Sequence, residues 1–112
     1  MERSIPKAMH IIGGRWRAVL VYSLAGGPMR YSDLQHQLKG ISTRMLSRDL
    51  RMLEVAGIVE RIPYPQAPIR VEYRLTPAGL ALCPIVTNLG MWAEGMVTHS
   101  ANSNSPISLP AE

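Results

Sequence analysis

The first part of the chain carries apolar residues at helical spacing. A short helix is expected within residues 1–14, ending at Gly13-Gly14, because glycine favours helix ends. A second helix is expected over about 16–25, stopped by Gly26-Gly27-Pro28. One face of the second helix should be buried, since apolar side chains recur at i, i+3, i+4 and i+8, as Trp16, Val19, Leu20 and Leu24.

Two more helices are predicted on either side of a tight turn. Ser32 followed by Gln35 fits a capping box and should begin a short helix. Gly40 suits the left-handed conformation that ends a helix, and Ser42 is a good N-cap for the next one. This next helix should span about 43–56. It should bury a stripe at i, i+4 and i+7, formed by Leu46, Leu50 and Leu53.

After Gly57 the apolar period shortens to two residues. Every second residue is apolar in the series Ile69, Val71, Tyr73 and Leu75, which predicts a half-buried strand. The run from Ile58 to Tyr64 is also strand-like, and a short loop with two prolines separates the runs. Residues 58–75 are therefore predicted to form a β-hairpin with a stiff tip.

A last helix is predicted from Pro77 to about Val97. Thr76 is a suitable N-cap, and proline is favoured at the first helical position. Pro84 lies inside this helix and should kink it or split it. From residue 98 the chain is rich in Ser, Asn and Pro, which predicts a disordered tail over 98–112.

This order of elements predicts a mainly α fold with a small β-hairpin, the winged helix-turn-helix. The chain has 112 residues, of which 46% are apolar and 18% charged, and this suits one packed domain. We assign residues 1–97 to this domain, with the wing at 58–75 and the last helix at 77–97.

Positive charge is confined to the first two-thirds of the chain. All 12 Lys and Arg lie between Arg3 and Arg74, so residues 1–75 sum to +6 (12 minus 6 acidic residues) and residues 76–112 to −2. A basic balance of this kind favours a polyanionic partner such as nucleic acid. The chain shows no secretion signal and no apolar run of membrane-spanning length, so a cytoplasmic, nucleoid-associated protein is expected.

Candidate DNA contacts gather on the helix predicted over 43–56. A stripe at i, i+3, i+4 and i+7, away from the leucine face, consists of Arg44, Ser47, Arg48 and Arg51. Arginine can bind guanine through two hydrogen bonds in the major groove, and it also binds phosphate. Ser42 and Thr43, at the start of the helix, suit phosphate because free backbone N–H groups point there.

The alternative for this stripe is an ordinary solvated face, with Asp49 and Glu54 pairing with nearby arginines.

The predicted wing allows two interpretations as well. Arg61, Gln66 and Arg70 could contact the phosphate backbone or enter the minor groove. In the alternative, Arg61 and Arg70 pair with Glu60 and Glu72.

Several other kinds of site find no support in the sequence. The three histidines, His10, His36 and His99, have no cysteine or carboxylate at metal-ligand spacing. No glycine-rich phosphate loop, nucleophile elbow or acid–base pair is present, so we expect neither an enzyme nor a cofactor.

A series of short motifs resembles the HxlR family of bacterial and archaeal winged-helix regulators. In chain order the series is Gly13-Gly14-Arg15-Trp16, Arg30-Tyr31 with Leu34, Gly40-Ile41-Ser42, Leu46 to Leu53-Glu54, Ala56 to Arg61, Tyr64-Pro65, Pro68, Val71 to Thr76, Gly79, Pro84 and Trp92. It covers about residues 6–95. The resemblance implies a homodimer on a palindromic operator, with helix 43–56 in the major groove, hairpin 58–75 as the wing, and the terminal helices at the dimer interface.

The chain departs from this family near its start. Many members carry a cysteine just before the proline that matches Pro6, and some sense oxidants or electrophiles through it. Here the segment is Ser4-Ile5-Pro6, so that mechanism does not transfer to this position. Asp49 also stands where a basic or polar residue is common, which affects the expected base preference.

The last helix carries apolar residues at the 3-4-3-4 spacing of a helix seam, namely Leu82, Ile85, Leu89, Trp92 and Met96. Packing within one subunit is the alternative, but the length of the helix and its lack of basic residues favour a partner helix.

The single cysteine, Cys83, is either a small buried residue or a candidate sensor. Five methionines could fill the core or line an effector pocket near this helix, namely Met9, Met45, Met52, Met91 and Met96.

The sequence thus predicts a sequence-specific, homodimeric transcriptional regulator that binds double-stranded DNA, modulated by a small-molecule effector or a redox signal. The alternative is a winged-helix module that binds protein and has no specific operator.

Overall fold

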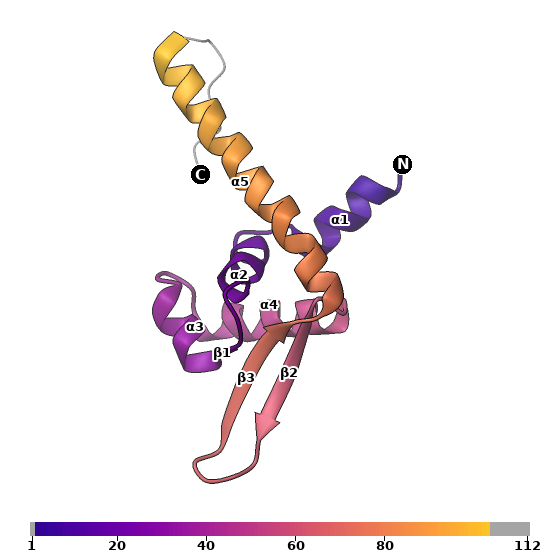
Figure 1. Cartoon of the computed structure of the whole chain (residues 1–112), viewed down its shortest axis with the longest axis vertical. Coiled ribbons are helices and arrows are strands. Elements are labelled where there is room, and N and C mark those ends of the chain that lie inside the picture. The colour runs from indigo at the N-terminus through magenta and orange to yellow at the C-terminus, as the bar shows by residue number, and fades with distance from the viewer. Residues whose placement is uncertain (1, 104–112) are drawn as a thin grey trace.

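The computed structural model describes the backbone of residues 2–103 and the side chains of residues 2–96. The elements are α1 (Ser4–Ile12), α2 (Arg17–Leu24), β1 (Met29–Arg30), α3 (Tyr31–Gln37), α4 (Thr43–Val55), β2 (Val59–Tyr64), β3 (Arg70–Leu75) and α5 (Pro77–Ser103). Helices α2 to α4 form the body, the β2–β3 hairpin projects from one end of it, and α5 extends from the other (Figure 1). The predicted winged helix-turn-helix is confirmed.

The sheet is antiparallel and has the strand order β1-β3-β2. The hairpin is in register from the pair Val59 and Leu75 to the pair Tyr64 and Arg70. Strand β1 was not predicted, because two residues are too few to show an alternating pattern. Ile69 was expected inside the second strand, but β3 begins at Arg70 and the Ile69 side chain is exposed.

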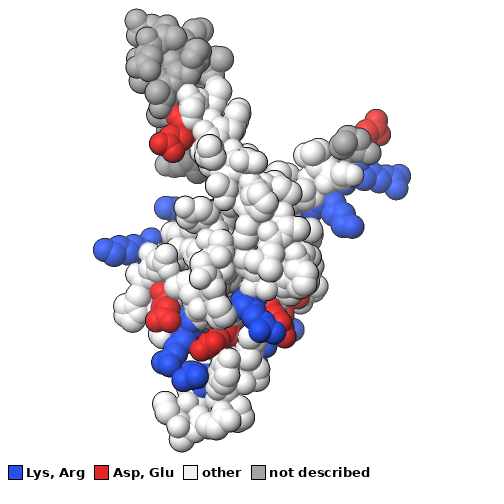
Figure 2. Space-filling view, viewed as in Figure 1, with Lys and Arg blue, Asp and Glu red and all other residues white. Residues whose placement is uncertain are grey.

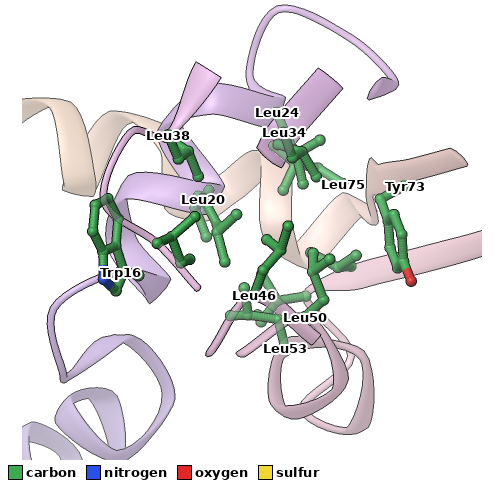
Figure 3. Close-up of a cluster of buried hydrophobic side chains, with 14 of the residues drawn as sticks. Trp16, Leu20, Leu24, Leu34, Leu38, Leu46, Leu50, Leu53, Tyr73 and Leu75 are labelled. Carbon is green, nitrogen blue, oxygen red and sulfur yellow. The ribbon is translucent and has the colours of Figure 1, made fainter. Parts of the chain in front are cut away.

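The core lies where α2, α3 and α4 meet the sheet and the first turns of α5. The predicted leucine stripe of α4 is buried, as Figure 3 shows for Leu46, Leu50 and Leu53. The prediction for α2 was wrong at Val19, which is exposed, while Val21 is fully buried. The reason is the position of α5, which leaves Val19 at the edge of a groove between the two helices.

Helix α3 begins earlier than the capping box at Ser32 and Gln35 predicts. Pairing with β3 holds Arg30 in an extended conformation, so the helix can start at Tyr31. The N–H of Arg30 then donates to the carboxylate of Asp33 at 3.3 Å, which satisfies a free donor at the helix start. Neither Ser32 nor Gln35 caps the helix.

Helix α5 starts as predicted, since the N–H of Gly79 donates to the Thr76 hydroxyl oxygen at 3.1 Å. It then runs through Pro84 without splitting. Pro84 removes the N–H that would bond to the carbonyl of Leu80, and both residues are exposed, so water can reach that carbonyl.

The helix also continues to Ser103, so the prediction of disorder from residue 98 is wrong for residues 98–103. That stretch contains neither proline nor glycine to end a helix. Residues 104–112 lie outside the described residues. Within residues 2–103, no helix is both long enough and apolar enough to cross a membrane.

Candidate nucleic-acid interface

The turn between α3 and α4 is short and well defined. Gly40 has φ +96°, the left-handed conformation that its lack of a Cβ permits. Ile41 follows as a buried anchor. Ser42 is the N-cap of α4, and its hydroxyl oxygen accepts from the N–H of Met45 at 3.1 Å. The predicted cap is confirmed, and it sets the point at which α4 leaves the turn.

Two side chains of α3 fix the orientation of α4. The Tyr31 hydroxyl lies 3.1 Å from the carbonyl oxygen of Thr43, to which it donates, and 2.9 Å from the hydroxyl oxygen of Ser47. The side-chain amide of Gln35 donates to the Thr43 hydroxyl oxygen at 3.0 Å. The first turns of α4 are therefore held rigidly against α3. Sequence reasoning missed this role of Tyr31 and Gln35, because no local pattern links residues so far apart.

The predicted basic stripe lies on the open face of α4. Arg44, Ser47, Arg48 and Arg51 are all exposed. Within the part of the chain that the structure describes, Arg44 and Arg51 form no ion pair. The Nε of Arg48 lies 3.3 Å from a carboxylate oxygen of Asp49, yet the Arg48 side chain remains 60% exposed. The stripe therefore keeps a strong positive charge facing solvent.

Asp49 is the one buried charged residue among the described side chains, with 2% of its surface exposed. Its Oδ1 accepts from the guanidinium of Arg17 on α2 at 3.3 Å, as well as from Arg48. Arg17 also donates to the carbonyl oxygen of Ile11, at the end of α1, at 2.9 Å. The expected pairing of Asp49 with a neighbouring arginine is confirmed for Arg48, whereas Arg17 was missed.

The charged residues of the hairpin follow the alternative pairing only in part. Arg70 packs over the Tyr64 ring, 4.7 Å from its centroid, and lies 3.7 Å from the Glu72 carboxylate. Glu60 pairs across the hairpin with Arg74, at 3.0 Å, instead of with Arg61. Of the alternative pairings, the one between Arg70 and Glu72 is therefore present. The one between Arg61 and Glu60 is not, because antiparallel register places Arg74 directly opposite Glu60.

Two candidate side chains of the wing stay open. Arg61 is exposed and makes no ion pair within the described residues. Gln66 is exposed in the loop at the tip of the hairpin. The structure thus leaves Arg61 and Gln66 available to a partner, while Arg70 is engaged.

The helix-turn-helix and its flanking elements match a known family model. The description of this model is HxlR-like helix-turn-helix, and it matches residues 11–101. The chain belongs to the HxlR family. It is therefore a DNA-binding transcriptional regulator of the winged helix-turn-helix type and not an enzyme, as the names of its relatives also indicate.

Three proteins illustrate the similarity. An HTH-type transcriptional regulator of Methanothermobacter thermautotrophicus is 38% identical over 89% of this chain and 76% of its own length. The HTH-type regulator YvaP of Bacillus subtilis is 41% identical over 84% of this chain and 87% of its own length. A solved structure of the redox regulator HypR in its oxidised form superposes with a TM-score of 0.78, at 38% identity, over 82% of this chain and 95% of that one.

The apolar seam of this HxlR-family chain is largely open to solvent. Ile85, Leu89 and Trp92 are exposed, with Trp92 at 61%, whereas Leu82 and Met96 are half-buried. The visible face of α5 also shows no Lys or Arg, in contrast to α1 and the body (Figure 2). An apolar groove of about 480 Å³ continues this surface between α2 and α5 and includes Val19, Tyr22 and Leu89.

The single cysteine and the methionines are not gathered into one pocket. Cys83 is half-buried and packs against the hydrophobic core. Met91 lines the groove between α2 and α5, whereas Met52 lines a second groove beside α1. Met45 packs against the core and Met9 is exposed. Of the two alternatives, filling of the core therefore holds for Met45, while Met91 and Met52 lie in two separate grooves because they belong to different elements.

Proposed function

We propose that the chain acts as a homodimer that binds a palindromic operator in double-stranded DNA. Helix α4 enters the major groove, and the β2–β3 hairpin lies along the backbone as the wing. The observation that carries this proposal is the exposed stripe of Arg44, Arg48 and Arg51 on a helix whose first turns are locked by Tyr31 and Gln35. A helix that is held in place and carries exposed guanidiniums can offer hydrogen bonds to base edges with little further ordering of its backbone.

The candidate contacts divide by their place on the surface. Residues in the first half of α4, Arg44, Ser47 and Arg48, are assigned to base edges, since the N-terminal part of a recognition helix enters the groove most deeply. Arg51 is assigned to phosphate, as are Ser42 and Thr43 through the start of the helix. In the wing, Arg61 and Gln66 are assigned to the backbone or minor groove, and Arg70 supports the hairpin through Tyr64.

The seam of α5 supplies the dimer interface in this proposal. Exposed apolar side chains at seam spacing, continuous with an apolar groove, favour a second copy of the same helix as the partner. A symmetric dimer then presents two copies of α4, which must lie roughly 34 Å apart to reach successive major grooves on one side of the duplex.

The test is a footprint of the purified protein across its genome, followed by titration of the recovered site with Arg48→Ala. The variant should raise the Kd by at least about fivefold and relax the base preference at one position of each half-site. Arg3→Ala is the matched control, because Arg3 precedes α1, away from α4, and its loss should change the Kd little. An unchanged Kd for Arg48→Ala at physiological salt would contradict the assignment, and a footprint without sequence preference would favour the protein-binding alternative.

For regulation, the redox regulator HypR is a structural neighbour, but we propose that a small molecule and not oxidation at Cys83 is the signal for this chain. Cys83 is half-buried and packs against the hydrophobic core, as expected of a small apolar side chain. Cys83→Ser should therefore bind the operator like the wild type, before and after diamide treatment. A diamide response in the wild type that disappears in the variant would identify Cys83 as the sensor.

A further inference from the structure

A second groove lies between the end of α1 and the C-terminal half of α4. Its volume is about 380 Å³, within the range of about 300–1,000 Å³ that is common for small-molecule sites. Its lining combines four apolar residues with two arginines and one histidine, namely Ile11, Met52, Val55, Ala56, Arg48, Arg51 and His10. This groove is separate from the apolar groove beside α5.

The chemistry of this groove favours an anion with an apolar body. No carboxylate is among its lining residues. Arg51 has no hydrogen-bond partner among the described side chains, and Arg48 uses only its Nε, toward Asp49, so its terminal nitrogens are free. Val55 is 80% exposed and lies on the same face of α4 as these arginines, where it offers apolar contact area that nothing in the described chain covers.

Arg17 connects the two walls of the groove, which are the end of α1 and the C-terminal half of α4. Its guanidinium bonds the carbonyl oxygen of Ile11 on α1 and the carboxylate of Asp49 on α4, and it lies 3.6 Å from the sulfur of Met52. The two walls are therefore connected by a nearly buried ion pair. A ligand would enter a groove that is already formed, which limits the loss of conformational entropy on binding.

We propose that this groove binds a small apolar carboxylate, such as an aromatic acid. The ring packs on Met52 and Val55, and the carboxylate accepts hydrogen bonds from Arg48 and Arg51. Because these two guanidiniums also belong to the stripe assigned to DNA, bound ligand lowers operator affinity. This second step rests on the proposed function, whereas binding of the acid to the groove does not.

Binding is tested without DNA, by NMR titration of the full-length protein with naphthalene-2-carboxylate. The amides of Ile11, Met52 and Val55 should shift, while those of Val19 and Gly90 in the groove beside α5 should not. The neutral isostere naphthalene-2-carboxamide should cause much smaller shifts, because it lacks the charge that the guanidiniums recognise. Shifts confined to Val19 and Gly90, equal shifts with both probes, or no shifts at all would overturn the proposal.

A pair of variants at one exposed position provides a matched test. Val55→Glu places a carboxylate at the mouth of the groove and should weaken binding of the acid by about tenfold or more through like-charge repulsion. Val55→Gln has the same shape without the charge and should bind the acid more tightly than Val55→Glu does. Similar affinities for the two variants would overturn the assignment of the carboxylate to this end of α4.

The regulatory step is measured separately, by titrating operator DNA in the presence of saturating naphthalene-2-carboxylate. The Kd for DNA should rise by at least about fivefold, the effect expected from losing one arginine–base contact. If the acid binds the groove but DNA affinity is unchanged, the competition is refuted and the binding site stands. If the protein binds the acid but no operator, it is the proposed function that fails.

Discussion

Asp49 shows how one residue can join two parts of this molecule. It lies on α4 between the buried leucine face and the open arginine face, where it accepts hydrogen bonds from Arg17 and Arg48. A buried carboxylate is tolerated only when it is paired and hydrogen-bonded, so its presence depends on Arg17. Through Arg17 the position of α4 is tied to the end of α1.

Asp49→Ala should therefore lower the free energy of unfolding by about 3 kcal/mol, because it leaves the nearly buried guanidinium of Arg17 without its carboxylate. We expect the lower end of the usual range, since Arg17 keeps its bond to the carbonyl of Ile11. Urea denaturation measures the change. Glu72→Ala is the control, because its pair with Arg70 is more exposed and should contribute less than about 1 kcal/mol. Equal losses for both variants would contradict the role given to Asp49.

At the scale of elements, the helix starts show what local sequence can and cannot specify. Ser42 and Thr76 were predicted as caps, and both accept a backbone N–H in the structure. The predicted cap at Ser32 fits the same sequence rule but is not used, because β1 pairs with β3 and the helix starts at Tyr31. All three residues fit the local capping rule. At Ser32 the pairing of β1 with β3 overrides it and moves the start of the helix to Tyr31.

This difference predicts unequal effects for two serine-to-alanine variants. Ser42→Ala should lower the free energy of unfolding by about 1 kcal/mol, because the N–H of Met45 loses its acceptor. Ser32→Ala should change it by less than about 0.5 kcal/mol, since the Ser32 hydroxyl caps nothing. Thermal and urea unfolding of both variants measures this. A larger loss at Ser32 than at Ser42 would show that α3 is capped as its sequence suggests.

At the scale of the whole molecule, charge and apolar surface separate along the chain. The basic residues lie on the body, the hairpin and α1, while α5 carries exposed apolar side chains and no Lys or Arg in its described part (Figure 2). This separation supports the proposal of two different partners, with DNA at one end of the molecule and a second copy of the chain at the other. The two surfaces should therefore be separable by mutation.

Trp92→Arg should convert the proposed dimer to a monomer in light scattering at micromolar concentration, because the interface between two copies of α5 would bury an unpaired charge. Operator affinity should fall as well, since two half-sites are no longer bound together. Ile69→Arg is the matched control for the mass measurement alone, because Ile69 is also exposed but lies in the hairpin, away from α5. A monomeric mass for the wild type would refute the dimer.

The periodic apolar positions and the cap and glycine residues by themselves determined the helices, the hairpin and the leucine face of α4. These features depend on interactions within a few residues of one another, so a local pattern carries them. Tertiary structure alone decided strand β1, the start of α3, the outward turn of Val19 and the partners of Asp49 and Glu60. Each of these depends on a contact between segments distant in sequence. The basic stripe of α4 depends on both kinds of information. Helical spacing predicted its residues, whereas the tertiary contacts of Tyr31, Gln35 and Arg17 hold α4 in place.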